Sequence, residues 1–319
     1  MREKSYLLYI MIAISLVILT SCNEGINNNL VEANPRIIMH AMGKTNVPIN
    51  PTRIVTLTNE ATEAMLVLDI QPVGSVKSWT GDPWWFTHIK NQMSGVSEVG
   101  YENQVDIDKI SSLKPDLIIG TKSLHKDIYD KLSYIAPTIF TENVSGDIRG
   151  NFSKYAESVN KEAQGSEVII NFNSRLTRVK NIAIEEKLTD KKIAVIGFFP
   201  DETYLFLQSS FIGNILDELG LKHTEINKQS NMQDFVSITK DDFLTIAETS
   251  IIILYFTYDE QSKAQQMNWF SNPIITNLTG TTLEKIYPVN PEIYYTSNGI
   301  IAANDVLDQL EYDFKNYHS

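Results

Sequence analysis

The sequence predicts an α/β protein of two similar lobes, each with a mostly parallel central sheet, joined by a single long helix. Short β-rich segments alternate with amphipathic helical segments in both halves of the chain, and this alternation is typical of parallel sheets covered by helices. A long helical segment without proline separates the halves, and two sequence patterns recur in the same order on either side of it. Such repetition indicates that the two lobes share a topology.

The first 22 residues have the layout of an export signal. A basic start, "MREK", precedes the uncharged apolar stretch "SYLLYIMIAISLVILTSC", which stops at Cys22, the only cysteine. A retained transmembrane helix is the alternative, although this stretch is at the short end for spanning a bilayer. "LTSC" resembles the lipobox of bacterial lipoproteins, which implies that residues 1–21 are removed and that acyl chains on Cys22 hold the protein on a membrane surface.

The next segment, "NEGINNNLVEANPR", is polar and predicts a flexible tether over residues 22–34, before a folded part that begins near Pro35. The remaining chain of about 285 residues is long enough for two domains with full cores. A single cysteine committed to lipid leaves no disulfide. The net charge of −12, without any basic run, argues against a nucleic-acid partner.

The first predicted lobe covers residues 35–161. Strands are expected at "RIVTL", "PVGSVK", "PDLIIG" and "PTIFT". Helices are expected at "NEATEAMLVLDI", capped by Thr58 or Asn59, at "DIDKISSL" and at "SLHKDIYDKLSYI". Strands and helices therefore alternate through this half.

Residues 162–188 predict the connecting helix. Apolar side chains recur there at helical spacing: Val168, Ile169, Phe172, Leu176, Val179 and Ile182. Such a helix would be about as long as a domain is wide. An ordinary surface helix of one domain is the alternative.

The second predicted lobe covers residues 189–319. Strands are expected at "KKIAVIGFF", "YLFLQ" and "SIIILYF", and helices at "SSFIGNILDELGL" and "TKDDFLTIAE". "TEAMLVLDIQPVG" matches "IGNILDELGLKHT", and "IDKISSLKPDLIIG" matches "TKDDFLTIAETSIIIL". These two matches are the repeat that predicts similar lobes.

Most of the chain after the tether resembles the substrate-binding lipoproteins of iron-siderophore ABC importers. "PINPTRIVTLTNEATEAMLVLDIQPVGSVKSW", "ISSLKPDLIIG" and "LSYIAPTIF" carry this resemblance, and "KSWTGDPWW", "GDIRGNF", "YFTYD" and "NWFSNPIITNL" are similar to the Gram-positive ferric citrate and hydroxamate branch. The resemblance implies a class III substrate-binding protein, monomeric and lipid-anchored on the extracytoplasmic face of the cell membrane. It would bind a ferric siderophore between the lobes and deliver it to an ABC permease dimer, with no cofactor and no metal ligands of its own.

Three tryptophans gather in "KSWTGDPWWFTHI", residues 77–89, around Gly81 and Pro83. Open α/β folds bind ligands in turns at the carboxyl ends of parallel strands, and indole rings offer a large contact area with little loss of rotamer entropy. Trp79 and Trp84 are therefore predicted to contact the ligand, and Trp85 to pack beneath the turn. Packing of all three as structural plugs is the alternative.

The opposite wall of the cleft should come from tyrosines of the second lobe. The candidates are Tyr204, Tyr255, Tyr258 and Tyr294. Each of them could instead be a plain packing residue at a strand end.

Charged residues bear on which siderophore is bound. The resemblance implies that relatives binding carboxylate-type chelates have arginines where this chain has Leu124, Ser145, Gly197 and Tyr204. Arginine can pair with both oxygens of a carboxylate. The absence of arginine at these four positions therefore favours a hydroxamate siderophore over a carboxylate one. The remaining cations are Lys77, Lys122, His125 and Arg149, of which Arg149 is the best placed for ligand contact.

Permease docking in this family uses one acidic residue on each lobe. The matching positions are Glu63 in "TEAMLVL" and Asp217 in "NILDELG", with Glu218 as the substitute. Rim charges of this kind chiefly steer association. A solvated helix face is the alternative explanation of these acids.

The chain contains no G-x-S-x-G, H-E-x-x-H or Gly-rich phosphate motif, and its five histidines are dispersed. We therefore do not expect an enzyme. Within the binding class, a haem- or cobalamin-binding protein of the same architecture is the alternative, and Tyr204 or Tyr258 would then serve as the axial haem ligand.

Overall fold

The computed structural model describes residues 35–81, 83–144, 146–189, 191–224, 234–250, 252–278 and 285–317. The predicted signal peptide, Cys22 and the tether lie outside the described residues. Residues Pro35–Ser319 form one compact unit. Within the described ranges, no helix combines the length and the apolar character needed to cross a membrane.

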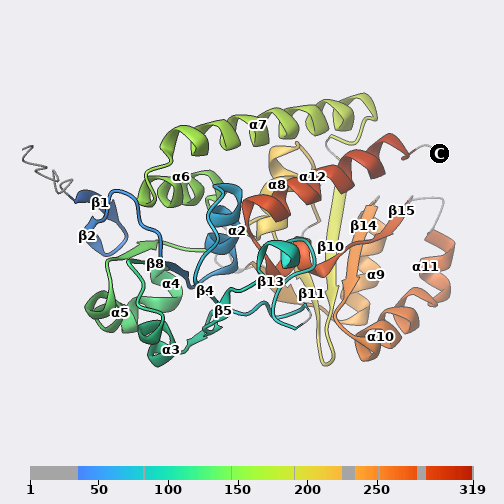
Figure 1. Cartoon of the computed structure of the whole chain (residues 1–319). Helices are drawn as coiled ribbons and strands as arrows, with labels where there is room; N and C mark the ends of the chain where they lie inside the picture. Colours follow the sequence, from blue (N-terminus) through green and yellow to red (C-terminus); the bar gives the residue numbers. More distant parts are fainter. Residues whose placement is uncertain are drawn as a thin grey trace, which may run out of the picture. The chain divides into compact units, whose positions relative to one another are not determined.

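The first half of this unit is organised around a sheet with strand order β5–β4–β3–β8–β9 (Figure 1). All of its neighbouring strands run parallel. Strands β3 and β8 are buried along their whole length, which explains their continuous apolar sequences. The strands are β3 (Ile54–Thr56), β4 (Gly74–Ser75), β5 (Ser97–Glu98), β8 (Leu117–Thr121) and β9 (Thr138–Thr141).

Helices and two small antiparallel hairpins complete this half. The helices are α2 (Asn59–Val67), η2 (Lys90–Gln92), α3 (Ile107–Ser112), α4 (Lys122–His125), η3 (Lys126–Ile128), α5 (Tyr129–Ile135) and α6 (Ile148–Ser158). The hairpins pair β1 (Arg36–His40) with β2 (Gly43–Val47) and β6 (Gly100–Tyr101) with β7 (Gln104–Val105).

The second half contains a mixed sheet with strand order β13–β11–β10–β14–β15, and β12 also pairs with β10. β12, β10, β14 and β15 run parallel, whereas β11 is antiparallel to both of its neighbours. The strands are β10 (Lys192–Phe198), β11 (Thr203–Phe206), β12 (Lys222–His223), β13 (Phe235–Ser237), β14 (Ile252–Thr257) and β15 (Lys285–Pro288). The helices are α8 (Phe211–Glu218), α9 (Lys240–Thr249), α10 (Glu260–Phe270), α11 (Pro273–Leu278), η4 (Glu292–Thr296) and α12 (Ile300–Lys315).

The internal repeat predicted from the sequence is present in the strand pairing. β3 pairs with β4 and β8 in the first sheet, as β10 pairs with β12 and β14 in the second. β9 then follows beside β8, as β15 follows beside β14. The antiparallel hairpin strand β11 and its neighbour β13 are the additions that distinguish the second sheet.

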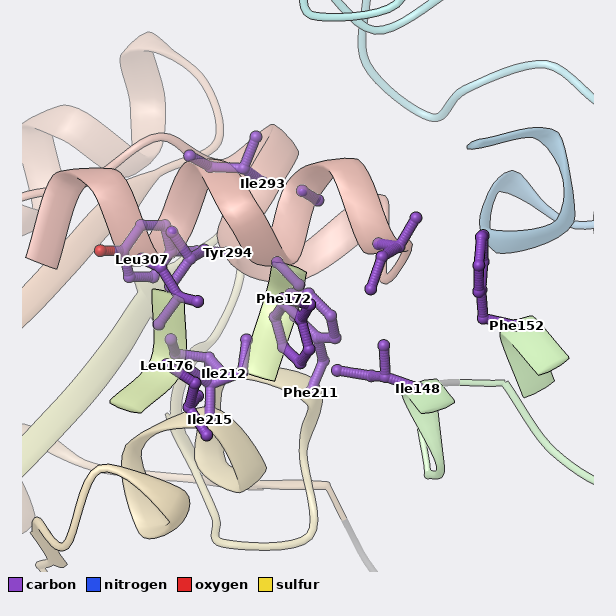
Figure 2. Close-up of a cluster of buried hydrophobic side chains, with 14 of the residues drawn as sticks. Ile148, Phe152, Phe172, Leu176, Phe211, Ile212, Ile215, Ile293, Tyr294 and Leu307 are labelled. Atoms are coloured by element: carbon purple, nitrogen blue, oxygen red, sulfur yellow. The ribbon is translucent and has the colours of Figure 1, made fainter. Parts of the chain in front are cut away.

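Helix α7 (Glu162–Glu185) packs against α6 of the first half and α12 of the second (Figure 1). Its side chains Phe172 and Leu176 enter a core cluster that also contains Ile148 of α6, Phe211 of α8 and Leu307 of α12 (Figure 2). Full burial of such a side chain contributes about 1.5–3 kcal/mol. The predicted long helix is therefore held by apolar contacts to both halves.

Side-chain caps fix where several helices begin. Thr58 accepts a hydrogen bond from the backbone N–H of Ala61 at the start of α2, and Ser210 does the same for Gly213 at the start of α8. The single helix predicted for "SLHKDIYDKLSYI" is divided into α4, η3 and α5. The break follows His125, which turns inward to accept from the Thr121 N–H and lies 2.8 Å from the carbonyl oxygen of Glu102.

Candidate functional site

A cavity of about 400 Å³ opens where the carboxyl ends of strands from both sheets meet. Its lining residues are Trp79, Glu102, Phe199, Tyr258, Tyr295, Thr296 and Asn298. Trp79 follows β4, Phe199 follows β10 and Tyr258 follows β14, so parallel strand ends direct residues from both halves to one place, as in other open α/β folds. The walls are mainly aromatic, and an aromatic cavity favours a bulky ligand with a flat or apolar periphery.

The first wall is a stack of rings on the β4 and β6 loops. Trp79 is 44% exposed and stacks on Tyr101 with ring centroids 4.8 Å apart. The Nζ of Lys77 lies 4.5 Å from the Tyr101 ring centroid and 4.8 Å from that of Trp84, a favourable cation–π geometry. Trp84 is 42% exposed but does not line the cavity. Trp79 therefore lines the cavity with its ring supported by Tyr101.

The tryptophan-rich turn is anchored by a small core of its own. Trp85 is only 7% exposed and packs in a cluster with Leu66 and Phe86. Gly81 has a φ of +114°, and a Cβ at this position would collide with the backbone of Trp85. Trp85 therefore packs beneath the turn, as expected, while the sharp backbone at Gly81 leaves Trp79 outside.

The second wall consists of aromatic rings that follow β10 and β14 or belong to η4. Tyr258 is 38% exposed and stacks on Phe199 at 5.6 Å, and Phe199 meets Tyr295 edge to face at 5.4 Å. The hydroxyl of Tyr258 donates a 3.5 Å hydrogen bond to the carbonyl oxygen of Trp79. The two walls therefore touch at the cavity, and the structure brings together Trp79 and Tyr258 as the sequence suggested.

The other predicted tyrosines lie elsewhere. Tyr204 packs edge to face behind Phe199, and a hydrogen bond to Glu202, together with burial, raises its pKa to about 12. Tyr255 lies on the face of β14 that points away from the cavity, and its ring packs against Phe270. Neither residue lines the aromatic cavity.

The prediction that Tyr294 lines the binding cleft is wrong, and the neighbouring Tyr295 occupies that position. Tyr294 is fully buried in the core cluster that also contains Leu307 (Figure 2), and burial raises the pKa of its phenol well above the usual range. Tyr295 lines the cavity instead. The two tyrosines are adjacent in η4, a π-helical turn, and "EIYYTSNG" gives no indication of which one faces the core.

Glu102 is the ionisable acid in the cavity wall. It lies in the turn between β6 and β7, and its Oε1 accepts hydrogen bonds from the backbone N–H and the side-chain Nδ2 of Asn59, at 2.6 and 3.1 Å. Burial raises the pKa of Glu102 to about 7, even though the bonds from Asn59 favour the ionised form. Glu102, Phe199 and Tyr295 were missed from the sequence, although Phe199 lies in the strand-end turn that contains Tyr204.

The cations that remained as candidates are committed to other groups. Lys77 pairs with Glu98 at 3.7 Å, and Lys122 pairs with Glu142 at 3.0 Å. Arg149, the favoured candidate, pairs through both terminal nitrogens with Glu218 at 2.9 and 2.7 Å.

Arg149 also donates from Nε to Asn173 of α7 at 2.6 Å. The structure therefore places Arg149 outside the cavity, where it ties α6 to α7 and α8. Glu218, the substitute docking acid, is the partner in this bridge.

The prediction that Glu63 docks a permease is also wrong, because its side chain is completely buried. Glu63 accepts hydrogen bonds from the backbone N–H groups of Ile301 and Ala302, at the start of α12, and from Ser297 and His88. Burial alone would lower the pKa of His88, but the bond to Glu63 and its charge raise it. Glu63 thus joins α2 of the first half to α12 of the second.

Asp217 keeps the exposure that docking requires, at the end of α8. In the ranges that the structure describes, no group of three or more His, Cys, Asp or Glu side chains is placed to hold a metal ion. The aromatic cavity, which gathers four rings from both halves, is the candidate site.

Comparison with known proteins gives a family and several relatives. Residues 54–287 match the family model described as periplasmic binding protein. The probable siderophore-binding lipoprotein YfiY of Bacillus subtilis (strain 168) is 36% identical, over 98% of this chain and 98% of its own length. The Fe(3+)-citrate-binding protein YfmC of the same bacterium is 27% identical, over 93% of this chain and 94% of its own.

Among solved structures, Staphylococcus aureus SirA complexed with staphyloferrin B has a TM-score of 0.77 at 27% identity, over 88% of this chain and 98% of that one. The comparisons confirm the resemblance to iron-siderophore substrate-binding lipoproteins and the predicted α/β fold of two lobes joined by a long helix. They also agree with the expectation of a binding protein rather than an enzyme. The chain belongs to the periplasmic binding protein family.

Proposed function

We propose that this protein captures a ferric siderophore in the aromatic cavity and delivers it to an ABC permease for iron uptake. The observation that carries the proposal is the pair of walls formed by Trp79 and, from the other half, Phe199, Tyr258 and Tyr295. The names of YfiY, as a probable siderophore-binding lipoprotein, and of SirA, complexed with staphyloferrin B, support the ligand class. Trp84 stays a proposed contact for a ligand that extends beyond the cavity rim.

A hydroxamate siderophore is favoured over a carboxylate one. Among the described residues, those lining the cavity include no Lys, Arg or His, and they do include Glu102. A polyanionic chelate would enter this cavity without a cationic partner, which is unfavourable where water is excluded. A neutral ferric trihydroxamate avoids that penalty.

The proposal also covers where the protein is anchored and how it meets the permease. Acylation of Cys22 would place the protein on the extracytoplasmic face of a Gram-positive membrane, and the B. subtilis relative YfiY is named a lipoprotein. We propose that residues 35–161 and 189–319 act as two lobes of a monomer, linked through the segment 162–188. Asp217 is the proposed contact with the permease.

A haem or cobalamin ligand is the alternative, and exposed Tyr258 would be the candidate axial ligand of haem. The haem propionates would, however, meet the same lack of cations as a carboxylate siderophore. Direct ligation of iron by Tyr258 would also remove the hydrogen bond that it donates to Trp79.

Tryptophan fluorescence of the protein from residue 23 onward tests the proposal. The titrants are a ferric trihydroxamate, ferric citrate, the iron-free hydroxamate and haemin. We expect saturable quenching by the ferric hydroxamate, and its loss in Trp79→Phe but not in the control Trp269→Phe, because Trp269 is buried in the core of the second sheet. Saturation by haemin alone would replace the siderophore with the haem alternative, and saturation by ferric citrate alone would refute the hydroxamate preference.

A further inference from the structure

Glu102 brings a carboxyl group to a cavity whose other lining residues are four aromatic residues, Thr296 and Asn298. Its Oε1 is engaged by Asn59, whereas Oε2 has no hydrogen-bond partner among the described residues. A carboxylate at this position does not serve the packing of rings around it. Its free oxygen is available to a group that enters the cavity.

Among the described residues, no cationic side chain pairs with the Glu102 carboxylate. Lys77 is held by Glu98 and by the rings of Tyr101 and Trp84. His125 contacts the backbone carbonyl of Glu102 rather than its side chain, and burial lowers the pKa of His125. The nearby Glu60 adds a second buried acid, whose pKa is raised to about 8 by burial and by neighbouring acids.

A ligand that fills the cavity removes water from Oε2. A buried acceptor that loses water without gaining a donor is penalised, and a charge-assisted hydrogen bond is stronger than a neutral one. A ligand that brings an N–H or ammonium group to this position is therefore favoured. A ligand that brings a carboxylate is rejected by like charge.

We infer that Glu102 is a specificity-determining residue that accepts a hydrogen bond from a donor on the ligand, so that the cavity selects a ferric chelate carrying an amine and no net negative charge. This inference rests on the proposed siderophore function and narrows it. The chelate's iron-binding groups face the aromatic rings, and its amine reaches Glu102.

Three matched chelates test the inference on the unaltered protein from residue 23 onward. They are a linear ferric trihydroxamate with a free terminal amine, its N-acetyl derivative and its N-succinyl derivative, which differ in charge at one end only. We expect affinity to fall in that order, with the amine binding about tenfold more tightly than the N-acetyl form, which corresponds to one charge-assisted hydrogen bond.

The variant Glu102→Gln should bring the amine and N-acetyl chelates to equal affinity, because its amide retains an acceptor for Asn59 but loses the charge. The matched control Asp108→Asn removes an exposed acid of the same half and should leave the tenfold ratio unchanged. Thermal unfolding of each variant verifies the fold.

Equal affinities for the three chelates in the unaltered protein, or an unchanged ratio in Glu102→Gln, would overturn the inference and leave the siderophore function standing. Failure of all three hydroxamates alongside tight binding of ferric citrate would overturn the hydroxamate assignment and the inference with it.

Discussion

Replacing Glu63 by alanine should lower the free energy of unfolding by about 3–5 kcal/mol, the usual effect of removing one member of a buried ion pair. The carboxylate accepts from the N–H groups of Ile301 and Ala302 at 2.7 and 3.0 Å, and it pairs with His88 at 2.6 Å. Truncation leaves these donors buried without an acceptor, at about 1–3 kcal/mol each. The individual losses are not additive because the groups share one network.

Urea unfolding of the protein from residue 23 onward measures this change. Glu167→Ala, at an exposed position of α7, is the matched control and should shift stability by less than about 0.5 kcal/mol. Gly299→Ala should reproduce part of the loss, because a Cβ there would collide with the Glu63 carboxylate. A loss below about 1 kcal/mol in Glu63→Ala would refute the idea that this carboxylate joins the two halves.

The same pair gives a pH dependence with a definite sign. The pKa of His88 in the folded protein is raised above its usual 6.5, because Glu63 outweighs the effect of burial. Stabilisation by the pair is therefore fully present below pH 6.5 and declines as the pH rises through the raised value. Glu63→Ala should remove this decline.

Three further predictions concern single side chains. Burial raises the pKa of Glu60 from 4.5 to about 8, so between these pH values the folded protein retains a proton that the unfolded chain loses. The free energy of unfolding should therefore fall by up to about 1.4 kcal/mol per pH unit in this range, and urea unfolding of Glu60→Gln at several pH values should show a smaller fall. Trp79→Ala should weaken chelate binding by about 2 kcal/mol in a fluorescence or calorimetric titration, with little loss of stability. Trp85→Ala should instead lower the free energy of unfolding by about 3–5 kcal/mol. The reverse pattern would mean that Trp85 contacts the chelate and Trp79 packs beneath the turn. Tyr294→Phe should leave affinity unchanged because its buried hydroxyl has no partner among the described residues, whereas Tyr295→Ala should weaken binding, and an equal loss in both would contradict the assignment.

Much of the fold could be predicted because its signals are local. Apolar runs such as that of β8 are typical of a strand buried on both faces, and the caps at Thr58 and Ser210 mark helix starts. The antiparallel direction of β11 is determined by tertiary packing, because its sequence is equally suited to a parallel strand.

The residues of the candidate site that follow parallel strands could be predicted from the sequence, and the others could not. Trp79 and Tyr258 follow parallel strands, so topology places them together. Tyr294 and Tyr295 differ only in the rotation of a π-helical turn, which periodicity does not determine. Glu63 looked like a surface acid because the backbone N–H groups that donate to it lie more than two hundred residues away in the chain, at the start of α12.

A crystal structure with a bound ferric trihydroxamate, phased on the anomalous scattering of iron, tests the proposed site most directly. We expect the iron within the cavity lined by Trp79, Phe199 and Tyr258, held by the hydroxamate oxygens and not by a protein atom. A second cavity of about 690 Å³, lined by His40, Glu142 and other residues, lies on the first half. Iron in that second cavity, or iron coordinated by the Tyr258 oxygen, would contradict the proposal.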